Sequence, residues 1–378
     1  MRILKTSASC CGCTACESVC QHKAITMQPN DLGFLYPVIN EKLCVDCGLC
    51  ERVCQFTQDY KRYENFSEPL VYGARSKSAD DLLQSQSGGA FYALAEIIIA
   101  EGGVVYGAGW GKDFKVVHKR ADSLVGCSEF RGSKYVQSDL QGIFHQVKND
   151  LKVGNMVLFT GTPCQVSGLK SFIPIKLQAN LYTVDLICHS VPSPAIWHDY
   201  IHWIEKKYGQ KIQRANFRNK KFGWHGCTES YEMKNGLEIN RKSLGFLFFN
   251  HLNIRESCSE CPYTNLKRVG DITIGDFWGW EKFYDQWNDN QGINLLLVNS
   301  EKGKNLFEKS IAKLEYIQSS VERCIQPQLK VPVNLSPVYS VFISDFKKRG
   351  IEYVLKKYAD EGLVFKIKKH IKRLINKK

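Results

Sequence analysis

Short apolar runs separated by polar turns recur through the middle of the chain and predict buried strands alternating with helices. The expected strands cover residues 70–74, 103–108, 155–160, 181–188, 271–277 and 293–299, and the expected helices cover 88–101, 194–208 and 302–314, with one more from the Gly-Thr-Pro turn through Leu169. Strands that alternate with helices in this way are typical of an α/β body with a mixed, mainly parallel sheet.

Beyond residue 212 the pattern becomes mixed. Two apolar-polar segments, 228–234 and 237–242, flank Asn235-Gly236, which is a strong hairpin signal. This portion is therefore expected to be a smaller α+β part of the body. The expected divisions are a head at 1–60, a polar linker at 61–69, an α/β domain at 70–210, the rest of the body at 211–325, and a connector with a basic tail at 326–378.

The first sixty residues contain the same cysteine spacing twice, C-x2-C-x2-C-x3-C. Three thiolates from one such loop bind a 4Fe-4S cluster, and in two-cluster ferredoxins the fourth cysteine of each run binds the other cluster. The expected ligands of cluster one are Cys10, Cys13, Cys16 and Cys54, and those of cluster two are Cys44, Cys47, Cys50 and Cys20. This spacing differs from that of zinc ribbons, so the head is expected to be an α+β dicluster ferredoxin domain.

Some residues in and beside this repeat need separate interpretation. Gly12 and Gly48 lie inside the loops, where backbone amides must turn toward the cluster. Gln21 and Gln55 follow the fourth cysteines, where proline is usual, which affects loop stiffness and not ligation. Cys11 is a spare cysteine that is not expected to bind iron.

Four further cysteines, Cys164, Cys188, Cys258 and Cys261, are candidates for another metal centre. Cys164 and Cys188 follow predicted strands, at the sheet edge where α/β folds bind ligands, and Cys258-x2-Cys261 has the spacing of half a metal site. The alternative is that these thiols fill the core, because free cysteine is often buried. Spacing alone leaves both interpretations open. Cys127, Cys227 and Cys324 have no partner at metal spacing and are expected to be structural.

Several segments between residues 70 and 325 resemble the beta subunit of coenzyme F420-reducing hydrogenases and its relatives, including bacterial members associated with polysaccharide biosynthesis. The segments that carry the resemblance are SGGAFYALAEIIIAEGG (87–103), FRGSKYVQSDL (130–140), FTGTPCQVSGLK (159–170), DLICHSVPSP (185–194), NFRNKKFGW (216–224), SCSECPY (257–263) and GDITIGDFWG (270–279). The resemblance implies FAD and a third 4Fe-4S cluster, held in the body by Cys164, Cys188, Cys258 and Cys261.

The residues that suit a flavin are grouped in four short segments. Glycines at a helix start let backbone amides approach a phosphate, and a loop with two cations and an aromatic side chain suits a pyrophosphate beside a ring. Helix caps and solvated loops of this kind are also common without a ligand. The candidates are Ser87, Gly88 and Gly89; Arg131, Gly132, Ser133, Lys134 and Tyr135; Gly161 and Thr162; and Asp276 and Trp278. His189 and Asp276 are the candidates for acid–base chemistry, and no catalytic residue is assigned.

The net charge of +13 belongs mostly to the C-terminus, because residues 346–378 carry 12 Lys or Arg against 3 Asp or Glu. The body is therefore not expected to bind nucleic acid. Ile367, Ile371, Leu374 and Ile375 form one stripe of a basic amphipathic helix, which would either rest on an anionic membrane surface or pack on the body. A start without an apolar signal segment, together with 16 cysteines, favours a cytoplasmic protein in a reducing compartment.

Together these features predict an iron–sulfur flavoprotein oxidoreductase that exchanges electrons between its clusters and FAD, and with an organic acceptor such as a deazaflavin or a biosynthetic intermediate. A ferredoxin or another electron donor is the expected protein partner. One alternative is an electron-relay subunit of a larger complex without substrate chemistry of its own. Another is a zinc-containing nucleic-acid-binding protein that uses Cys258, Cys261 and the basic tail. The sequence does not give the substrate, the direction of electron flow or the oligomeric state.

Overall fold

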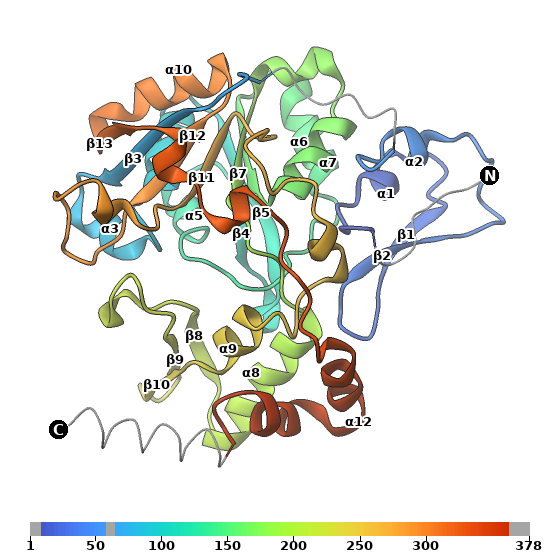
Figure 1. Ribbon diagram of the computed structural model, residues 1–378. Helices are drawn as coiled ribbons and strands as arrows, with labels where there is room; N and C mark the ends of the chain where they lie inside the picture. The colour runs from blue at the N-terminus through green and yellow to red at the C-terminus, as the bar shows by residue number, and fades with distance from the viewer. Residues whose placement is uncertain (1–8, 58–64, 363–378) are drawn as a thin grey trace.

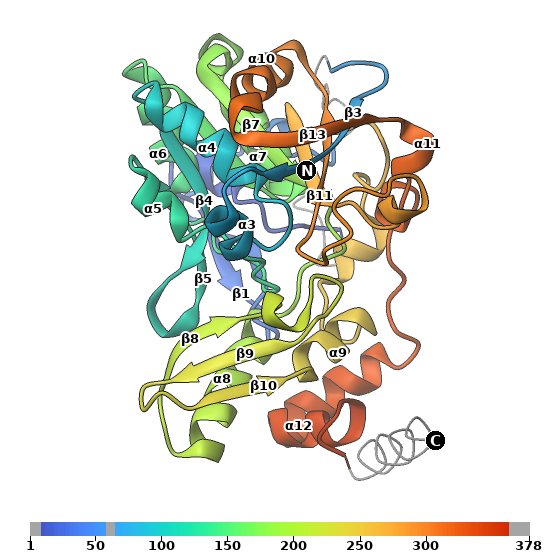
Figure 2. The same ribbon diagram turned by 90° about the vertical axis from the view of Figure 1, so that its left-hand side faces the viewer.

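The computed structural model describes residues 9–57 and 65–362. Residues 9–57, called the head below, lie to one side of residues 65–362, called the body (Figure 1). The body contains an eight-stranded sheet and, below it in Figures 1 and 2, a separate three-stranded sheet. The body therefore has a larger part built on the eight-stranded sheet and a smaller part built on the three-stranded sheet. The head lies against the larger part.

The head consists of one hairpin and two short helices. Strands β1 (Ile25–Pro29) and β2 (Leu35–Ile39) pair antiparallel, and helices α1 (Ala15–Val19) and α2 (Leu49–Arg52) each follow a cysteine loop. Both helices begin after a residue with positive φ, at 65° for Thr14 and 69° for Gly48. This α+β arrangement is the one expected for the dicluster ferredoxin domain.

The large sheet has the strand order β13-β3-β12-β11-β7-β6-β4-β5. The four strands in its centre, β11, β7, β6 and β4, pair parallel, and the remaining neighbours pair antiparallel. Their bounds are β3 (Leu70–Ser76), β4 (Val104–Trp110), β5 (Val116–Ala121), β6 (Val157–Gly161), β7 (Leu181–Leu186), β11 (Ile272–Asp276), β12 (Asn294–Val298) and β13 (Leu314–Ser319). The expected α/β body with a mixed sheet is confirmed, and its parallel pairing is confined to the core.

Helices cover both faces of the large sheet. On one face, α4 (Ala90–Ala100) and α10 (Glu301–Ser310) pack with the inward side chains of β4, β6, β7, β11 and β12. On the other face, α6 (Ile143–Lys152) and α7 (Pro163–Phe172) pack on β4, β6 and β7. Ala15 and Val53 of the head join that second cluster. The head is therefore continuous with the hydrophobic core of the body.

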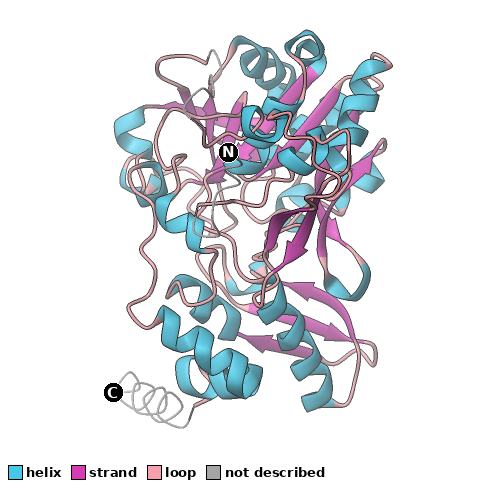
Figure 3. Cartoon of the chain, turned by 90° about the vertical axis from the view of Figure 1, so that its right-hand side faces the viewer, coloured by secondary structure: helices cyan, strands magenta, loops and turns pink. Residues whose placement is uncertain are grey.

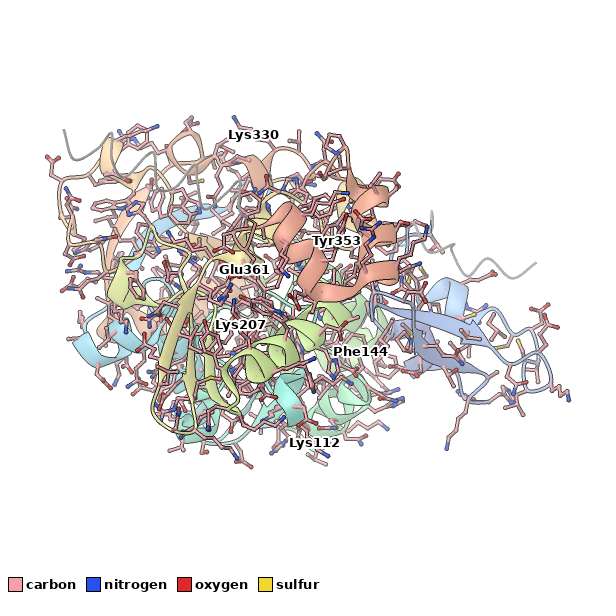
Figure 4. The ribbon with its side chains drawn as sticks, turned by 90° about the horizontal axis from the view of Figure 1, so that it is seen from below. Lys112, Phe144, Lys207, Lys330, Tyr353 and Glu361 are labelled. Atoms are coloured by element: carbon pink, nitrogen blue, oxygen red, sulfur yellow. The ribbon has the colours of Figure 1, made fainter. Side chains whose placement is uncertain are left out.

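The smaller part combines β8 (Ile212–Asn216), β9 (Glu229–Met233) and β10 (Glu238–Arg241) with three helices (Figure 3). These helices are α8 (Pro194–Tyr208), α9 (Ser243–Phe249) and α12 (Tyr339–Tyr358). Lys207 of α8 and Glu361, which follows α12, lie side by side (Figure 4) and form an ion pair of 2.9 Å. The chain end that the structure describes is thus attached to the smaller sheet and its helices.

The remaining helices are short connections. They are α3 (Ala79–Gln84), α5 (Leu124–Ser128) and α11 (Val321–Cys324), with 3-10 helices at Lys112–Phe114, Ile175–Asn180, Lys220–Phe222, Glu256–Glu260, Trp280–Lys282, Ile311–Lys313 and Pro327–Leu329.

The C-terminal region differs from the expected connector and tail in one respect. Residues 346–358 belong to α12, and Phe346, Val354 and Leu355 are buried in the core beneath α8. The basic stripe formed by Ile367, Ile371, Leu374 and Ile375 lies outside the described residues. Within the described residues, no helix is long and apolar enough to cross a membrane.

Candidate iron–sulfur and cavity site

Cys10, Cys13, Cys16 and Cys54, called set one, are neighbours in the structure. Burial raises the pKa of Cys16, and negative charge on Cys13, Cys10 and Cys54 raises it further. Four thiolates held this close would repel one another strongly unless cations bound between them. The gathering of Cys54 with the first loop is the exchange of fourth ligands expected for two-cluster ferredoxins.

Cys20, Cys44, Cys47 and Cys50, called set two, line one cavity of about 110 Å³ in the head. Burial raises the pKa of Cys50, with contributions from Glu51 and Cys44. Cys47 is exposed, whereas the other three thiols are half-buried. Set two therefore lies nearer the surface than set one, where a protein electron donor can approach.

Cys164, Cys188, Cys258 and Cys261, called the body set, also come together. Burial raises the pKa of Cys188, and Cys258, Cys164 and Cys261 raise it further. Cys164 is at the start of α7, Cys188 follows β7, and the other two lie at the 3-10 helix Glu256–Glu260. The thiols thus come from three loops at one edge of the sheet, and they are not core filler spread through the body.

The donor chemistry of the three sets fits iron–sulfur clusters. Among residues 9–57 and 65–362, no three His, Cys, Asp or Glu side chains converge on a point that would hold a single metal ion. A zinc ion needs four ligands at about 2.0–2.3 Å from one centre, whereas the cysteines of a 4Fe-4S cluster bind four separate corners of a cube. All-thiol sets of four suit the cube.

The structure brings set one and the body set into direct contact. Cys11 lies between them, and its hydrogen bonding lowers the pKa of Cys13 to about 7 and also lowers that of Cys164. Gln55 donates to the Cys164 carbonyl at 2.8 Å and to Cys11 Sγ at 3.5 Å. A Cβ at Gly168 of α7 would lie 2.7 Å from Cys13 Sγ, so only glycine permits this approach.

The body set borders the main cavity of the body, which has a volume of about 370 Å³. Cys188 lines this cavity, as do all the candidate flavin residues except Gly88. Gly88 is instead packed between strands, because a Cβ there would lie 2.2 Å from the Ala74 carbonyl. The volume is in the range of small-molecule sites.

Lys134 is a half-buried basic residue of the cavity wall. Its Nζ donates to the carbonyls of Arg131 at 3.0 Å and Gly132 at 3.3 Å, and it forms no ion pair within the described part of the chain. Burial lowers its pKa to about 7. Such a group gains stability from an anionic ligand.

The guanidinium of Arg131 is held by contacts with other residues of the protein. Its guanidinium pairs with Asp81 at 2.6 Å, donates to Gln84 at 3.0 Å and stacks over the Tyr92 ring. The loop of residues 130–135 is therefore anchored to α3 and α4 rather than solvated, and Arg131 contributes a fixed wall.

Asp276 is likewise engaged on both oxygens. Arg218 pairs with Oδ2 at 2.6 Å and Trp224 donates to Oδ1 at 3.0 Å. Trp278, next in the wall, stacks on Trp224 at 4.9 Å between ring centroids and is 41% exposed. In this arrangement Asp276 orients Arg218, whose guanidinium carbon lies 5.5 Å from the centroid of the Trp278 ring, and Trp278 contributes a partly exposed aromatic ring to the wall.

His189 is held between two partners. Gln328 Nε2 donates to its Nδ1 at 2.8 Å, and its Nε2 meets His251 Nε2 at 2.9 Å. Burial lowers the pKa of His189 to about 4. A neutral ring that accepts at Nδ1 carries its hydrogen on Nε2, so both nitrogens are occupied.

Sequence reasoning did not identify several functional candidates in this region. Arg218 and Gln55 act through partners distant in the chain. Gln55 directly follows a ferredoxin cysteine, but the local motif does not indicate its contacts with Cys11 and Cys164. The cavity wall also has buried polar atoms without a hydrogen-bond partner among the described residues: His118 Nδ1, Arg131 Nε, Ser190 Oγ, Arg218 Nε and Gln326 Oε1. Such atoms are rare in folded proteins and suit a polar ligand.

Two family models match the chain. Residues 9–57 match the 4Fe-4S dicluster domain, and residues 154–322 match the family described as the C terminus of the beta subunit of coenzyme F420 hydrogenase/dehydrogenase. The second match contains the body set, Asp276 and Trp278, and it does not include the segments at residues 87–89 and 131–135. The matches agree with the division between head and body sites.

Two curated proteins are similar over most of the chain. The F subunit of F(420)H(2) dehydrogenase from Methanosarcina mazei is 24% identical over 326 residues, which cover 82% of this chain and 84% of that protein. Coenzyme F420-dependent sulfite reductase of Methanocaldococcus jannaschii is 21% identical over 356 residues, which cover 86% of this chain and 49% of that protein. This chain therefore spans about half the length of the second relative.

A solved structure is also similar. One chain of the F420-reducing NiFe hydrogenase complex from Methanosarcina barkeri, from a study of its xenon derivatization, is 16% identical with a TM-score of 0.47. The similarity covers 80% of this chain and 98% of that chain.

Proposed function

We propose that this chain, which joins a 4Fe-4S dicluster domain to a region of the coenzyme F420 hydrogenase/dehydrogenase beta family, is an FAD-dependent iron–sulfur oxidoreductase. Clusters exchange one electron at a time, whereas most organic reductions need two. FAD, when bound, would supply the conversion between single electrons and a hydride. The protein's task is to place the clusters in sequence and to hold the organic groups next to the last one.

The observation that carries this proposal is the continuity of the three cysteine sets with the cavity. Set two lies nearest the surface, and set one contacts the body set through Cys11 and Gln55. Cys188 belongs both to the body set and to the cavity wall. These contacts support a one-electron route from set one through the body set to the cavity. Set two would lie at the outer end of this route, because Cys20 and Cys50 belong to the same two cysteine runs as Cys16 and Cys54.

The cavity offers the chemistry that FAD requires. Lys134 has its ammonium group in the cavity wall, where an anionic pyrophosphate would favour the protonated form, and Gly132, with a φ of 77°, allows close approach of the backbone. The partly exposed ring of Trp278 offers an aromatic contact for a planar group, and the Ser190 and Gln326 oxygens, which have no hydrogen-bond partner among the described residues, supply polar contacts. Among the earlier candidates, Ser87, Gly89, Ser133, Tyr135, Gly161 and Thr162 complete the lining.

The acceptor is proposed as a class. Both curated relatives have F420 in their names, so this deazaflavin is the first organic acceptor or donor to be tested. A biosynthetic intermediate is the second class, because the fold alone does not fix the substrate.

The alternative is an electron-relay subunit. One relative is named as a subunit of a dehydrogenase, and the half-exposed position of set two suits transfer to or from another protein. Turnover of acceptors by the purified chain with reduced viologen or ferredoxin would favour the self-contained enzyme. Turnover only after addition of a partner subunit would favour the relay.

The sharpest test compares two cysteines of the same cavity. Cys188→Ala removes a member of the body set, and Cys227→Ala removes a cavity-lining cysteine that belongs to no set. In anaerobic protein reduced by viologen, Cys188→Ala is expected to slow bleaching of the bound flavin at least tenfold, with the head clusters retained. Cys227→Ala should behave as the unmodified chain. Purified protein without flavin, or equal bleaching in both variants, would contradict the proposal.

A further inference from the structure

Arg255 is a buried arginine at the junction of head and body. Its side chain is among the largest that are fully buried, with the residue 1% exposed. The guanidinium donates three hydrogen bonds: to the Cys10 carbonyl at 2.8 Å, to Gln137 Oε1 at 2.8 Å and to the Leu35 carbonyl at 2.9 Å. It therefore connects the first cluster loop and β2 of the head to the body.

All three acceptors are uncharged. Two other buried arginines of the described chain each pair with a carboxylate, Arg268 with Asp185 at 2.8 Å and Arg218 with Asp276 at 2.6 Å. Arg255 forms no such ion pair with any residue in the described ranges. A buried cation without a counter-charge is strongly unfavourable, so its charge calls for a compensating anion.

Arg255 is in direct contact with both cysteine sets. Its Nε donates to the Cys10 carbonyl of set one, and its own carbonyl accepts from the Cys258 amide of the body set at 3.0 Å. Gln137, which accepts from the guanidinium, donates to the carbonyl of Cys11 at 2.8 Å. The guanidinium therefore lies where the two sets meet.

The first cluster loop is shaped to admit the guanidinium. Gly12 has a φ of 70°, and a Cβ at this position would lie 2.9 Å from Arg255 Nη1. The glycine therefore serves close packing against the cation as well as the turn of the loop.

We propose that Arg255 is the positioning residue of the junction between cluster one and the body cluster, and that the negative charge of these two clusters is its counter-charge. This inference rests on the proposed function. Reduction adds an electron to a cluster, and a fixed cation nearby stabilises the reduced form. Arg255 thus raises the reduction potentials of both clusters together and favours electron passage between them.

Cluster two provides an internal reference. The cysteines of set two line a separate cavity of the head, and Arg255 is not among the residues that line it. The potential of cluster two should therefore respond little to changes at Arg255.

The first test introduces a carboxylate beside Arg255 without removing it. Gln137→Glu is nearly isosteric and would pair with the guanidinium, which cancels its charge toward the clusters. The anaerobic full chain is titrated with reductant and followed by EPR. We expect the equilibrium constants for reduction of cluster one and of the body cluster to fall at least tenfold, which corresponds to potentials lower by 59 mV for one electron. Gln137→Met also loses the hydrogen bond to the Cys11 carbonyl, and it loses the one from Arg255 as well. It adds no charge, and it should leave the potentials near those of the unmodified chain.

The second test separates charge from shape. Arg255→Lys keeps the charge and loses the three-way hydrogen bonding, whereas Arg255→Gln loses the charge. We expect potentials near the original in the Lys variant and lower ones in the Gln variant, or loss of the iron of these two clusters in the Gln variant alone. Equal behaviour of the two variants, or unchanged potentials in Gln137→Glu, would overturn the role of Arg255. Absence of clusters from the unmodified chain would overturn the proposed function as well.

Discussion

Glu229 shows what burial does to a single residue of this chain. It lies on β9 and accepts hydrogen bonds from the Gly245 amide at 2.7 Å and from the hydroxyls of Tyr231 at 3.0 Å and Tyr200 at 3.2 Å. Burial nevertheless raises its pKa to about 7. The folded protein therefore binds a proton at Glu229 more tightly than the unfolded chain does.

The sign of the pH dependence follows from linkage. Because the folded pKa is above the unfolded value, the protonated side chain favours folding below about pH 4.5, and this contribution is lost as the pH rises through 7. Glu229→Gln should remove up to about 3 kcal/mol of this pH-dependent change in the free energy of unfolding. Thermal unfolding midpoints of the anaerobic protein from pH 5 to 8 measure the difference.

A control lies on the same strand. Glu232 is partly exposed and forms only a 3.6 Å ion pair with Arg214, so Glu232→Gln should keep the original pH profile. Parallel profiles for the unmodified chain and Glu229→Gln would show that Glu229 does not titrate in this range.

At the scale of elements, a buried ion pair holds the loops that carry the body set. Asp185, at the end of β7, accepts from Arg268 at 2.8 Å and from the Gly270 amide at 2.8 Å. Arg268 also donates to the Leu186 carbonyl at 2.9 Å and to the Tyr263 carbonyl. The pair thereby fixes the strand leading to Cys188 relative to the loop after Cys261.

Removing one partner of this ion pair should lower the free energy of unfolding more than removing both partners. Arg268→Met leaves the Asp185 carboxylate buried without its cation, and we expect a loss of about 3–5 kcal/mol in the free energy of unfolding. The double variant Asp185→Asn with Arg268→Met should recover part of that loss. Unfolding midpoints and iron content of both proteins measure this, and a double variant no more stable than the single one would count against the explanation.

The contact between α7 and the head gives rise to a second prediction at the scale of helices and strands. Gly168→Ala places a Cβ 2.7 Å from Cys13 Sγ, so α7 and the first cluster loop must separate. We expect cluster one to be lost preferentially, with about four fewer irons per chain. Gly245→Ala is the matched control, because its nearest atom would be at an ordinary 3.6 Å. Equal iron content in the two variants would show that the contact is not tight.

At the scale of the whole molecule, the head, the body set and the cavity form one arrangement. The head packs into the same core as α6 and α7, so it is fixed relative to the body and does not depend on a linker for its position. The smaller sheet supplies Arg218 through the segment after β8, and this residue reaches Asp276 of the large sheet. The cavity thus has walls from both parts.

The sequence allowed the central strands of the sheet to be predicted from their continuous apolar runs, and it also predicted helices α4, α7, α8 and α10. Helix α6 and the edge strands β5 and β13 were not anticipated, and β13 begins at Leu314, which was expected to belong to the preceding helix. The ferredoxin cysteines could be predicted from local spacing. The contacts of Arg255, Gln55 and Arg218 could not, because each depends on segments that meet only in the folded chain.

The central claim concerns three clusters in one chain, and iron and acid-labile sulfide per chain test it most directly. Protein purified without oxygen should contain about twelve irons and twelve sulfides, four for each set. Zinc in place of iron, or colourless protein without sulfide, would contradict the account.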